Sequence, residues 1–221
     1  MWPLGDDSRR PRDFPIATVA IIALNLFAFV LELGGGDDFV LRWAVVPNDI
    51  TTGRALITIL TSMFLHGSWS HIIGNMVFLW AFGPEIEDAM GPVRYVAFYL
   101  IGGAVAMLAQ VAGDPHSTVP SLGASGAIAA VMGAFLVTYP SDRIRTVIFF
   151  GFFFRITLIP AALLIGLWFV IQLFSLGTVS GVETQTGGVA YLAHVGGCIF
   201  GALTARFFEV RNAITPGDRD F

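Results

Sequence analysis

The chain has 221 residues, of which 55% are hydrophobic and only 13% charged, with a mean hydropathy of +0.75 and a formal net charge of −4. So few charges are unusual for a soluble domain, and recurring apolar windows of about 18 or more residues indicate membrane-spanning helices. The small acidic net charge argues against a nucleic-acid partner. The single cysteine, Cys198, excludes an internal disulfide and a cysteine-based zinc site.

Six apolar segments follow one another along the chain. We expect helices over residues 14–33, 69–88, 92–112, 122–139, 157–176 and 189–208. The long connection at 34–61 mixes glycine, acidic and aromatic residues, which suits a segment lying partly in the membrane interface. Residues 144–154 extend the fifth segment beyond one ordinary span, so we expect them to be interfacial, with Arg155 and Pro160 breaking the run.

This pattern predicts an all-α membrane protein, a compact bundle of six transmembrane helices over residues 14–208. Residues 1–13 and 209–221 are then the two tails, which share one side of the membrane. Ten of the twelve arginines fall on that side: Arg9, Arg10, Arg12, Arg94, Arg143, Arg145, Arg155, Arg206, Arg211 and Arg219. Only Arg42 and Arg54 fall on the other, so the positive-inside rule predicts that both termini are cytoplasmic.

With this orientation the second, fourth and sixth helices all enter the membrane from the outer face. His71 and Asn75 lie in the first turns of the second helix, and Ser125 lies in the first turn of the fourth. His194 is about five residues into the sixth helix. Four polar groups therefore share the outer part of the bilayer, where polar side chains are costly and are candidates for function.

These residue types suit acyl transfer. Ser125 and a histidine supply a nucleophile and its base. His71 and Asn75 are four residues apart, so they share a helix face from which imidazole and amide groups can stabilise an oxyanion. Backbone N–H groups at the start of the fourth helix can add to this, and Gly123 and Gly126 allow a substrate backbone to approach.

Small residues recur at four-residue spacing on the sixth helix and predict close helix packing. They are Ala193, Gly197, Gly201 and Ala205, facing Gly126, Ala130, Gly133 and Ala134 of the fourth helix. Contact between these faces would bring His194 towards Ser125. Each feature also has a plainer interpretation: a serine in such a helix usually bonds to backbone, and small-residue ridges usually mean packing only. His66 is expected to orient the outer loop, and no nearby carboxylate or His-Glu-x-x-His spacing supports a metal site.

Four motifs in this order resemble the rhomboid family of intramembrane serine proteases, over about residues 14–208. They are His66-Gly-Ser-Trp-Ser-His71-Ile-Ile-Gly-Asn75, Glu87-Asp-Ala-Met-Gly91, Gly123-Ala-Ser125-Gly126 and Ala193-His194-Val-Gly-Gly197-x-x-x-Gly201. Any one of them is weak, whereas all four on six apolar segments are specific.

The resemblance implies a Ser125–His194 dyad without a third acidic member, and an oxyanion site formed by His71, Asn75 and the Ser125 backbone amide. It also implies single-span membrane proteins as substrates, cut near small residues, and no cofactor. The fifth helix and the loop at 177–188 would act as gate and cap. A prokaryotic plasma membrane, with the site opening to the outer side, is the expected location.

Two positions depart from the family pattern. Many relatives carry Trp-Arg in the first outer loop, where this chain has Ile57-Thr58. Many also carry an aromatic residue four positions after the serine, stacking on the histidine, where this chain has Ala129. The second departure leaves His194 without its usual support.

Two other classes of function compete with the protease. A catalytically inactive relative that binds membrane-protein clients typically lacks the serine or the histidine, and this chain has both. A channel or small-solute transporter would need a polar pathway, and no inverted repeat is evident between the halves of the chain.

Overall fold

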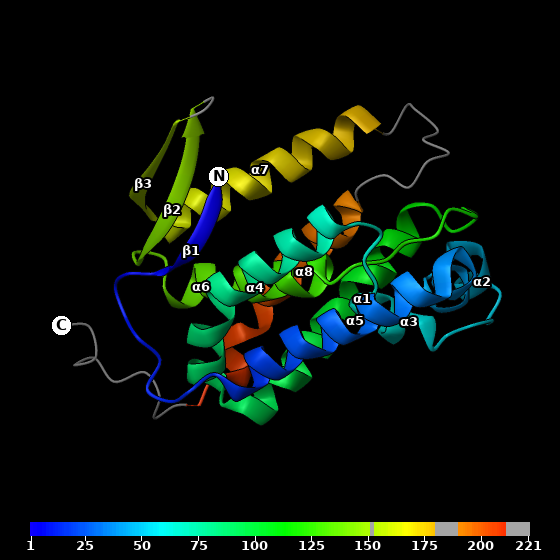
Figure 1. Ribbon diagram of the computed structural model, residues 1–221, viewed down its shortest axis with the longest axis horizontal. Helices are drawn as coiled ribbons and strands as arrows, with labels where there is room; N and C mark the ends of the chain where they lie inside the picture. Colours follow the sequence, from blue (N-terminus) through cyan, green and yellow to red (C-terminus); the bar gives the residue numbers. More distant parts are fainter. Residues whose placement is uncertain (151–152, 180–189, 211–221) are drawn as a thin grey trace.

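The computed structural model describes residues 1–150, 153–179 and 190–210, and it is mostly helical (Figure 1). Its long helices pack against one another, and short helical turns fill the connection after the first of them. In chain order the helices are α1 (Ile16–Trp43), α2 (Pro47–Thr51), α3 (Thr58–Thr61), the 3-10 turn η1 (Ser62–Phe64), α4 (Trp69–Met90), α5 (Pro92–Gly113), α6 (Ser125–Thr138), α7 (Ala161–Val179) and α8 (Tyr191–Phe208).

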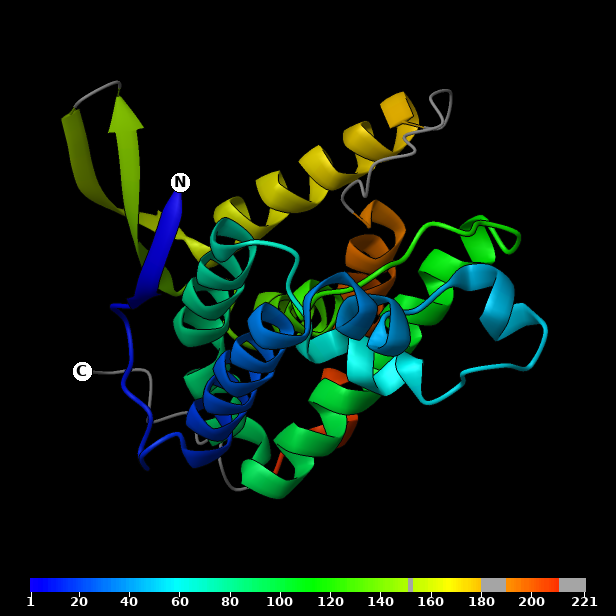
Figure 2. The ribbon, with the colours of Figure 1, turned by 45° about the vertical axis from the view of Figure 1, so that its right-hand side comes forward.

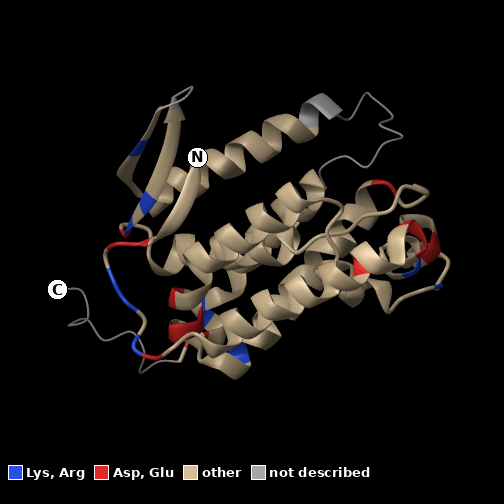
Figure 3. Cartoon of the chain, viewed as in Figure 1, with Lys and Arg blue, Asp and Glu red and all other residues tan. Residues whose placement is uncertain are grey.

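Each predicted helix overlaps one of the long helices α1, α4, α5, α6, α7 and α8. Within the described ranges, α1, α5 and α8 are long and apolar enough to cross a membrane. Figure 3 shows most charged residues gathered at the two ends of the helices, with few between them. The chain is therefore a mostly helical membrane protein, while the six-span count and the cytoplasmic placement of both termini stay predictions.

Helix α6 is the centre of the bundle. Every residue from Gly126 to Phe135 is buried, and α6 contacts α4, α5, α7 and α8 (Figure 2). A helix that is apolar on every side is typically enclosed in this way. The position of α6 brings its first residue, Ser125, between neighbouring helices rather than onto the outside of the molecule.

The contact between α6 and α8 is close enough to require glycine. A β carbon on Gly197 would overlap the carbonyl oxygen of Gly126, and one on Gly201 would overlap that of Ala130. Small residues at such spacing let two helix backbones approach. The small-residue faces predicted on the two helices do meet.

The Glu-x-x-x-Gly element has a structural role at the other end of the bundle. The Glu87 carboxylate of α4 accepts hydrogen bonds from the backbone N–H groups of Ala17 and Thr18, at 2.8 and 2.7 Å, and from the Thr18 hydroxyl. These are first-turn amides of α1, which have no partner within their own helix. Gly91, with φ of 72°, then ends α4. The element thus joins the start of α1 to the end of α4.

The prediction of an all-α fold is wrong for residues 143–160. This segment forms β2 (Arg143–Phe150) and β3 (Phe153–Pro160), which pair antiparallel. The N-terminal β1 (Trp2–Asp6) pairs with β2 and completes a three-stranded sheet in the order β1-β2-β3. The described residues of the expected interfacial segment, 144–150 and 153–154, and the first residues of the expected fifth helix are therefore in strands, because β-branched and aromatic residues fill them.

Part of one face of this sheet is apolar and exposed. The pairing sets Trp2 opposite Val147, Val147 opposite Ile156 and Phe149 opposite Phe154, so these residues share a face. The Trp2 and Phe149 rings meet edge to face with 6.2 Å between centroids. Both rings and the side chains of Phe154 and Ile156 are about half exposed or more. Exposed aromatic side chains of this kind are typical of a membrane interface.

Charged side chains hold β1 in place. Arg9 hydrogen-bonds to Asp142, and its guanidinium carbon lies 3.6 Å from the centroid of the Tyr139 ring. Asp6, at the end of β1, accepts a 2.7 Å hydrogen bond from the Ser8 N–H and lies 3.7 Å from the Arg9 side chain. Burial, reinforced by the neighbouring Asp142, raises the pKa of Asp6 to about 7.

The attachment of β1 is therefore expected to weaken as pH rises. The pKa of Asp6 increases on folding from 3.8 to about 7, so the attached strand favours the protonated carboxyl. This contribution is complete below about pH 4 and is lost as pH rises through about 7. Hydrogen exchange of residues 2–6, corrected for intrinsic rates, should show more opening at about pH 8 than at about pH 5.5. Asp6→Asn should remove the difference, and equal protection of the wild type at both values would contradict the prediction.

Candidate active site

Ser125 is the first residue of α6 and follows a tight turn. Gly123 has φ of 126°, a conformation that favours glycine, and its N–H donates to the Ser62 carbonyl at 2.9 Å. The turn directs the chain into α6, so that the backbone N–H groups of Ser125 and Gly126 lie in the first turn, where amides have no partner within the helix. The start of α6 can therefore offer N–H donors beside the serine hydroxyl.

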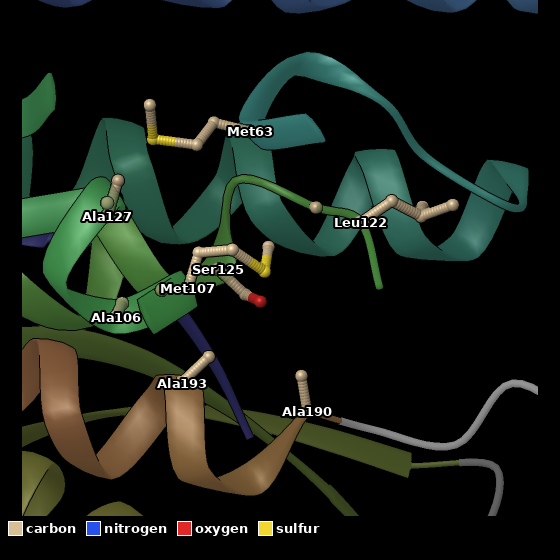
Figure 4. Close-up of a pocket in the computed structure, with 11 residues that line it drawn as sticks. Met63, Ala106, Met107, Leu122, Ser125, Ala127, Ala190 and Ala193 are labelled. Carbon is tan, nitrogen blue, oxygen red and sulfur yellow. The ribbon is translucent and has the colours of Figure 1, made fainter. Parts of the chain in front are cut away.

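The Ser125 side chain lines a small pocket that has room for about one water molecule (Figure 4). The pocket lies between η1, α5, the start of α6 and the start of α8. Its walls are mostly small residues and two methionines: Met63, Gly103, Ala106, Met107, Leu122, Gly123, Gly126, Ala127, Ala190 and Ala193. In Figure 4 the hydroxyl of Ser125 projects into this space. The serine is thus accessible, although the rest of α6 is buried.

His71 lies directly against the turn that precedes Ser125. A β carbon on Gly123 would be 2.9 Å from His71 Nε2 and 3.7 Å from Ser125 Oγ, so the imidazole and the hydroxyl flank the same point. His71 lies in the first turn of α4, where its N–H donates to the capping hydroxyl of Ser68 at 3.2 Å. The structure therefore brings together two of the residues that the sequence singled out.

Asn75 lies one turn further along α4 and is 8% exposed. Its amide nitrogen, Nδ2, has no hydrogen-bond partner among the described residues. An unpaired buried amide is costly, and such groups are often found where a ligand or a reacting group completes the bonding. Asn75 therefore lies on the same helix as His71 and carries an N–H donor that has no acceptor among the described residues.

His194 reaches the site through the contact between α8 and α6. The residue before it, Ala193, lies against Gly126, since a β carbon on Gly126 would be 3.6 Å from Ala193 Cβ. His194 is 9% exposed. In the described part of the chain, no hydrogen bond joins it to Ser125. Hydrogen bonds between catalytic groups are often long in free enzymes and shorten when substrate binds.

Two residues of α7 contact His194, and sequence reasoning missed both. His194 Nδ1 lies 2.7 Å from Gln172 Oε1, and the Trp168 ring lies against the imidazole with 5.6 Å between centroids. Gln172 is 7% exposed. Its sequence signal was an amide in an otherwise apolar helix, a pattern that marks candidates for function in membranes. Ala129, at the position where an aromatic residue was expected, is fully buried within α6.

His66 occupies a fully buried position next to the site. Its backbone N–H donates to the Glu32 carboxylate of α1 at 2.8 Å, and its ring meets the His71 ring with 5.2 Å between centroids. That His66 orients the loop before α4 stays a prediction. The Ile57-Thr58 pair lies at the start of α3, where Thr58 is buried and its hydroxyl donates to the Ala55 carbonyl. Most of the predicted cap, 177–188, lies outside the described residues, which end at 179 and resume at 190.

Together these groups form a set that suits hydrolysis of an acyl bond. A serine hydroxyl opens into a pocket, the imidazole of His194 lies on the adjacent helix, and an imidazole and an unpaired amide lie on a third helix. Such a set supplies a nucleophile, a proton acceptor and oxyanion donors.

A family model for the rhomboid domain matches residues 53–210. The chain is similar to Rhomboid protein 1, mitochondrial, of Saccharomyces cerevisiae, with 28% identity over 189 residues that cover 83% of this chain and 51% of the yeast protein. It is also similar to Rhomboid protease GluP of Bacillus subtilis, with 32% identity over 133 residues that cover 58% of this chain and 26% of that protein. A third relative is the Presenilin-associated rhomboid-like protein, mitochondrial, of Rattus norvegicus, at 37% over 92 residues, or 40% of this chain and 24% of the rat protein.

The matches thus span about half of the yeast relative and about a quarter of the other two. Mitochondrial and bacterial proteins both occur among these relatives, so the expected prokaryotic plasma membrane is not supported by them. The rhomboid-domain match covers most of the chain, including α4 to α8 and therefore Ser125 and His194. The chain belongs to the rhomboid family.

Proposed function

We propose that this protein is an intramembrane serine endopeptidase that cleaves transmembrane segments of membrane-protein substrates. The observation that carries the proposal is the pocket at the start of α6, where the Ser125 hydroxyl is accessible and His71 flanks the same turn. The contact of Ala193 with Gly126 supports His194 as the partner of the serine. The protease named among the relatives agrees with this chemistry.

In the proposed mechanism Ser125 Oγ attacks the scissile carbonyl carbon while His194 Nε2 accepts the hydroxyl proton. The resulting oxyanion accepts hydrogen bonds from His71, from the Asn75 amide and from the Ser125 backbone N–H. His194 then gives its proton to the leaving amine as the peptide bond breaks, and an acyl-serine remains. Water, deprotonated by His194, hydrolyses this ester and restores the hydroxyl.

The pocket supports a preference for small side chains next to the scissile bond. Alanine and glycine form much of its wall, and Met63 and Met107 close off further space. A large side chain would have to displace these packed groups, which is costly in a close-packed interior. The substrates are therefore membrane proteins with small residues at the cleavage site.

The proposed topology has six spans over residues 14–208, with the tails 1–13 and 209–221 in the cytoplasm. The arginine distribution supports this orientation. The active site would then open to the outer side of its membrane.

Labelling with a fluorophosphonate probe tests the proposal without knowledge of the substrate. Purified wild type, Ser125→Ala and His194→Ala would be labelled side by side in mild detergent, with folding of each checked by circular dichroism. We expect labelling only when both residues are present, because the probe reacts with an activated serine. Folded wild type that takes no label and cleaves no transmembrane substrate in proteoliposomes would overturn the proposal and favour a client-binding relative.

Asn75→Ala is expected to lower turnover by about ten- to a thousandfold, the range for loss of one oxyanion donor among several. The unpaired Nδ2 of Asn75 motivates this expectation, because nothing else in the described structure uses that donor. The loss should fall on kcat rather than KM, since the oxyanion exists only after attack. Asn75→Leu, which keeps the size and has no donor, is a second test, and a kcat unchanged by both substitutions would remove Asn75 from this role.

A further inference from the structure

His194 is held by α7 as well as by its own helix. Its Nδ1 atom is hydrogen-bonded to Gln172 Oε1 at 2.7 Å, and Trp168 covers its ring at an interplanar angle of 38°. Gln172 and Trp168 are four residues apart, so they lie on one face of α7. The same helix exposes Leu163 and Phe174 on another face. One face of α7 thus places the Gln172 amide and the Trp168 indole against His194, and another face exposes apolar side chains.

The Gln172 contact determines which nitrogen of His194 carries the proton. Gln172 places its amide oxygen at Nδ1, and an amide oxygen can only accept a hydrogen bond, so this arrangement fits the neutral ring with its proton on Nδ1. Nε2 then has a free lone pair, as a base requires. A buried aspartate performs the same orienting task in serine proteases that have a third member. Here a neutral amide from a neighbouring helix occupies the corresponding position.

The Trp168 contact compensates for Ala129. The sequence lacks an aromatic side chain four residues after Ser125, and Ala129 leaves no ring on α6 to lie against His194. The ring is supplied instead by α7. The Tyr191 ring of α8 also meets the imidazole edge to face, with 6.5 Å between centroids. The hydrogen bond and the nearer of the two ring contacts, which is tilted, both come from α7.

We propose that Gln172 and Trp168 are positioning residues for His194, and that packing of α7 on α8 sets the orientation and tautomer of the base. This inference rests on the proposed protease function. Displacement of α7 from α8 removes both supports together. The orientation of the base, and with it the rate of the chemical step, then depends on how α7 packs against α8.

Steady-state kinetics in proteoliposomes test the positioning role. Gln172→Leu should lower kcat by about 10- to 100-fold, as loss of a hydrogen-bond partner does for metal-binding histidines, with KM little changed. Gln172→Glu keeps an acceptor oxygen at the same reach and should retain most of the activity. Trp168→Phe, which keeps an aromatic ring, should likewise retain a higher kcat than Trp168→Ala. Because the two residues support one ring, the double variant Gln172→Leu with Trp168→Ala should lose less than the product of the single losses.

Nitrogen NMR of histidine-labelled protein gives a readout that does not depend on activity. We expect the His194 signals, assigned by their loss in His194→Gln, to report the Nδ1–H tautomer in the wild type and a mixture of tautomers in Gln172→Leu. Dominance of the Nε2–H tautomer in the wild type would overturn the inference. So would a Gln172→Leu variant with unchanged kcat in a protein whose wild type requires Ser125 and His194. A wild type that neither labels nor cleaves would instead overturn the proposed function, so the two failures are distinct.

Discussion

Ser125→Ala and His194→Ala are each expected to abolish cleavage of a transmembrane substrate while leaving the helices folded. Without Oγ no acyl-enzyme forms, and without the imidazole no group on α8 can take the hydroxyl proton. In a soluble serine protease, loss of either residue costs on the order of 10⁶ in kcat. Cleavage would be measured in proteoliposomes with a single-span substrate carrying small residues in its helix. Ser125 is a small side chain that lines the pocket, so Ser125→Ala should change thermal unfolding little. His194→Ala removes a buried ring from its contacts with Gln172 and Trp168 and should lower the unfolding temperature modestly without unfolding the helices.

The double variant provides the sharper measurement. If Ser125 and His194 act as a unit, the double variant should be no slower than either single variant. Losses that multiply would instead indicate two residues acting independently, and the dyad assignment would fail. Thr52→Ala is a suitable control, because Thr52 is exposed and its hydroxyl donates to the local Asn48 and Asp49 carbonyls of α2, away from the site residues. Its cleavage rate should equal that of the wild type.

The helices were predictable because their signal is local. Length and apolar composition alone identify a membrane helix, and α4 and α5 begin at the predicted residues Trp69 and Pro92. The sheet was not predictable in the same way. Its first strand pairs Trp2 with Val147, which is far away in the sequence. The strands of the hairpin lie in a long apolar run that also suits a membrane helix. The alternation of Arg143 and Arg145 with apolar residues, and the abundance of isoleucine and phenylalanine, were the available signals.

The residues of the candidate site also differ in whether a local sequence signal identifies them. Ser125, His71, Asn75 and His194 lie in motifs, and the sequence alone singled them out. Gln172 has no motif, and its significance depends on how α7 packs against α8. The absence of an aromatic residue at Ala129 was visible in the sequence, but its replacement by a ring from another helix was not, because that contact is tertiary.

Gly201→Leu is expected to disrupt the bundle itself. A β carbon at this position already overlaps the carbonyl oxygen of Ala130, and backbone atoms of α6 cannot move aside as a flexible side chain can. Leucine would force α8 away from α6, which carries His194 away from Ser125. Overpacking of this kind costs about 1–3 kcal/mol, and more where backbone must shift. Thermal unfolding in detergent should occur at a clearly lower temperature, with activity lost in parallel.

Comparison of Gly201→Ala with Gly166→Ala separates the effect of packing on stability from the effect of helix propensity. Both substitutions add one methyl group within a helix, which by propensity alone stabilises it by up to about 1 kcal/mol. At Gly166 of α7 nothing lies within 4 Å of the added carbon, whereas at Gly201 it meets Ala130. We expect Gly166→Ala to be neutral or stabilising and Gly201→Ala to be destabilising. Equal stability of the two variants would mean that α6 and α8 are not in close contact, and the route by which α8 brings His194 to Ser125 would be lost with it.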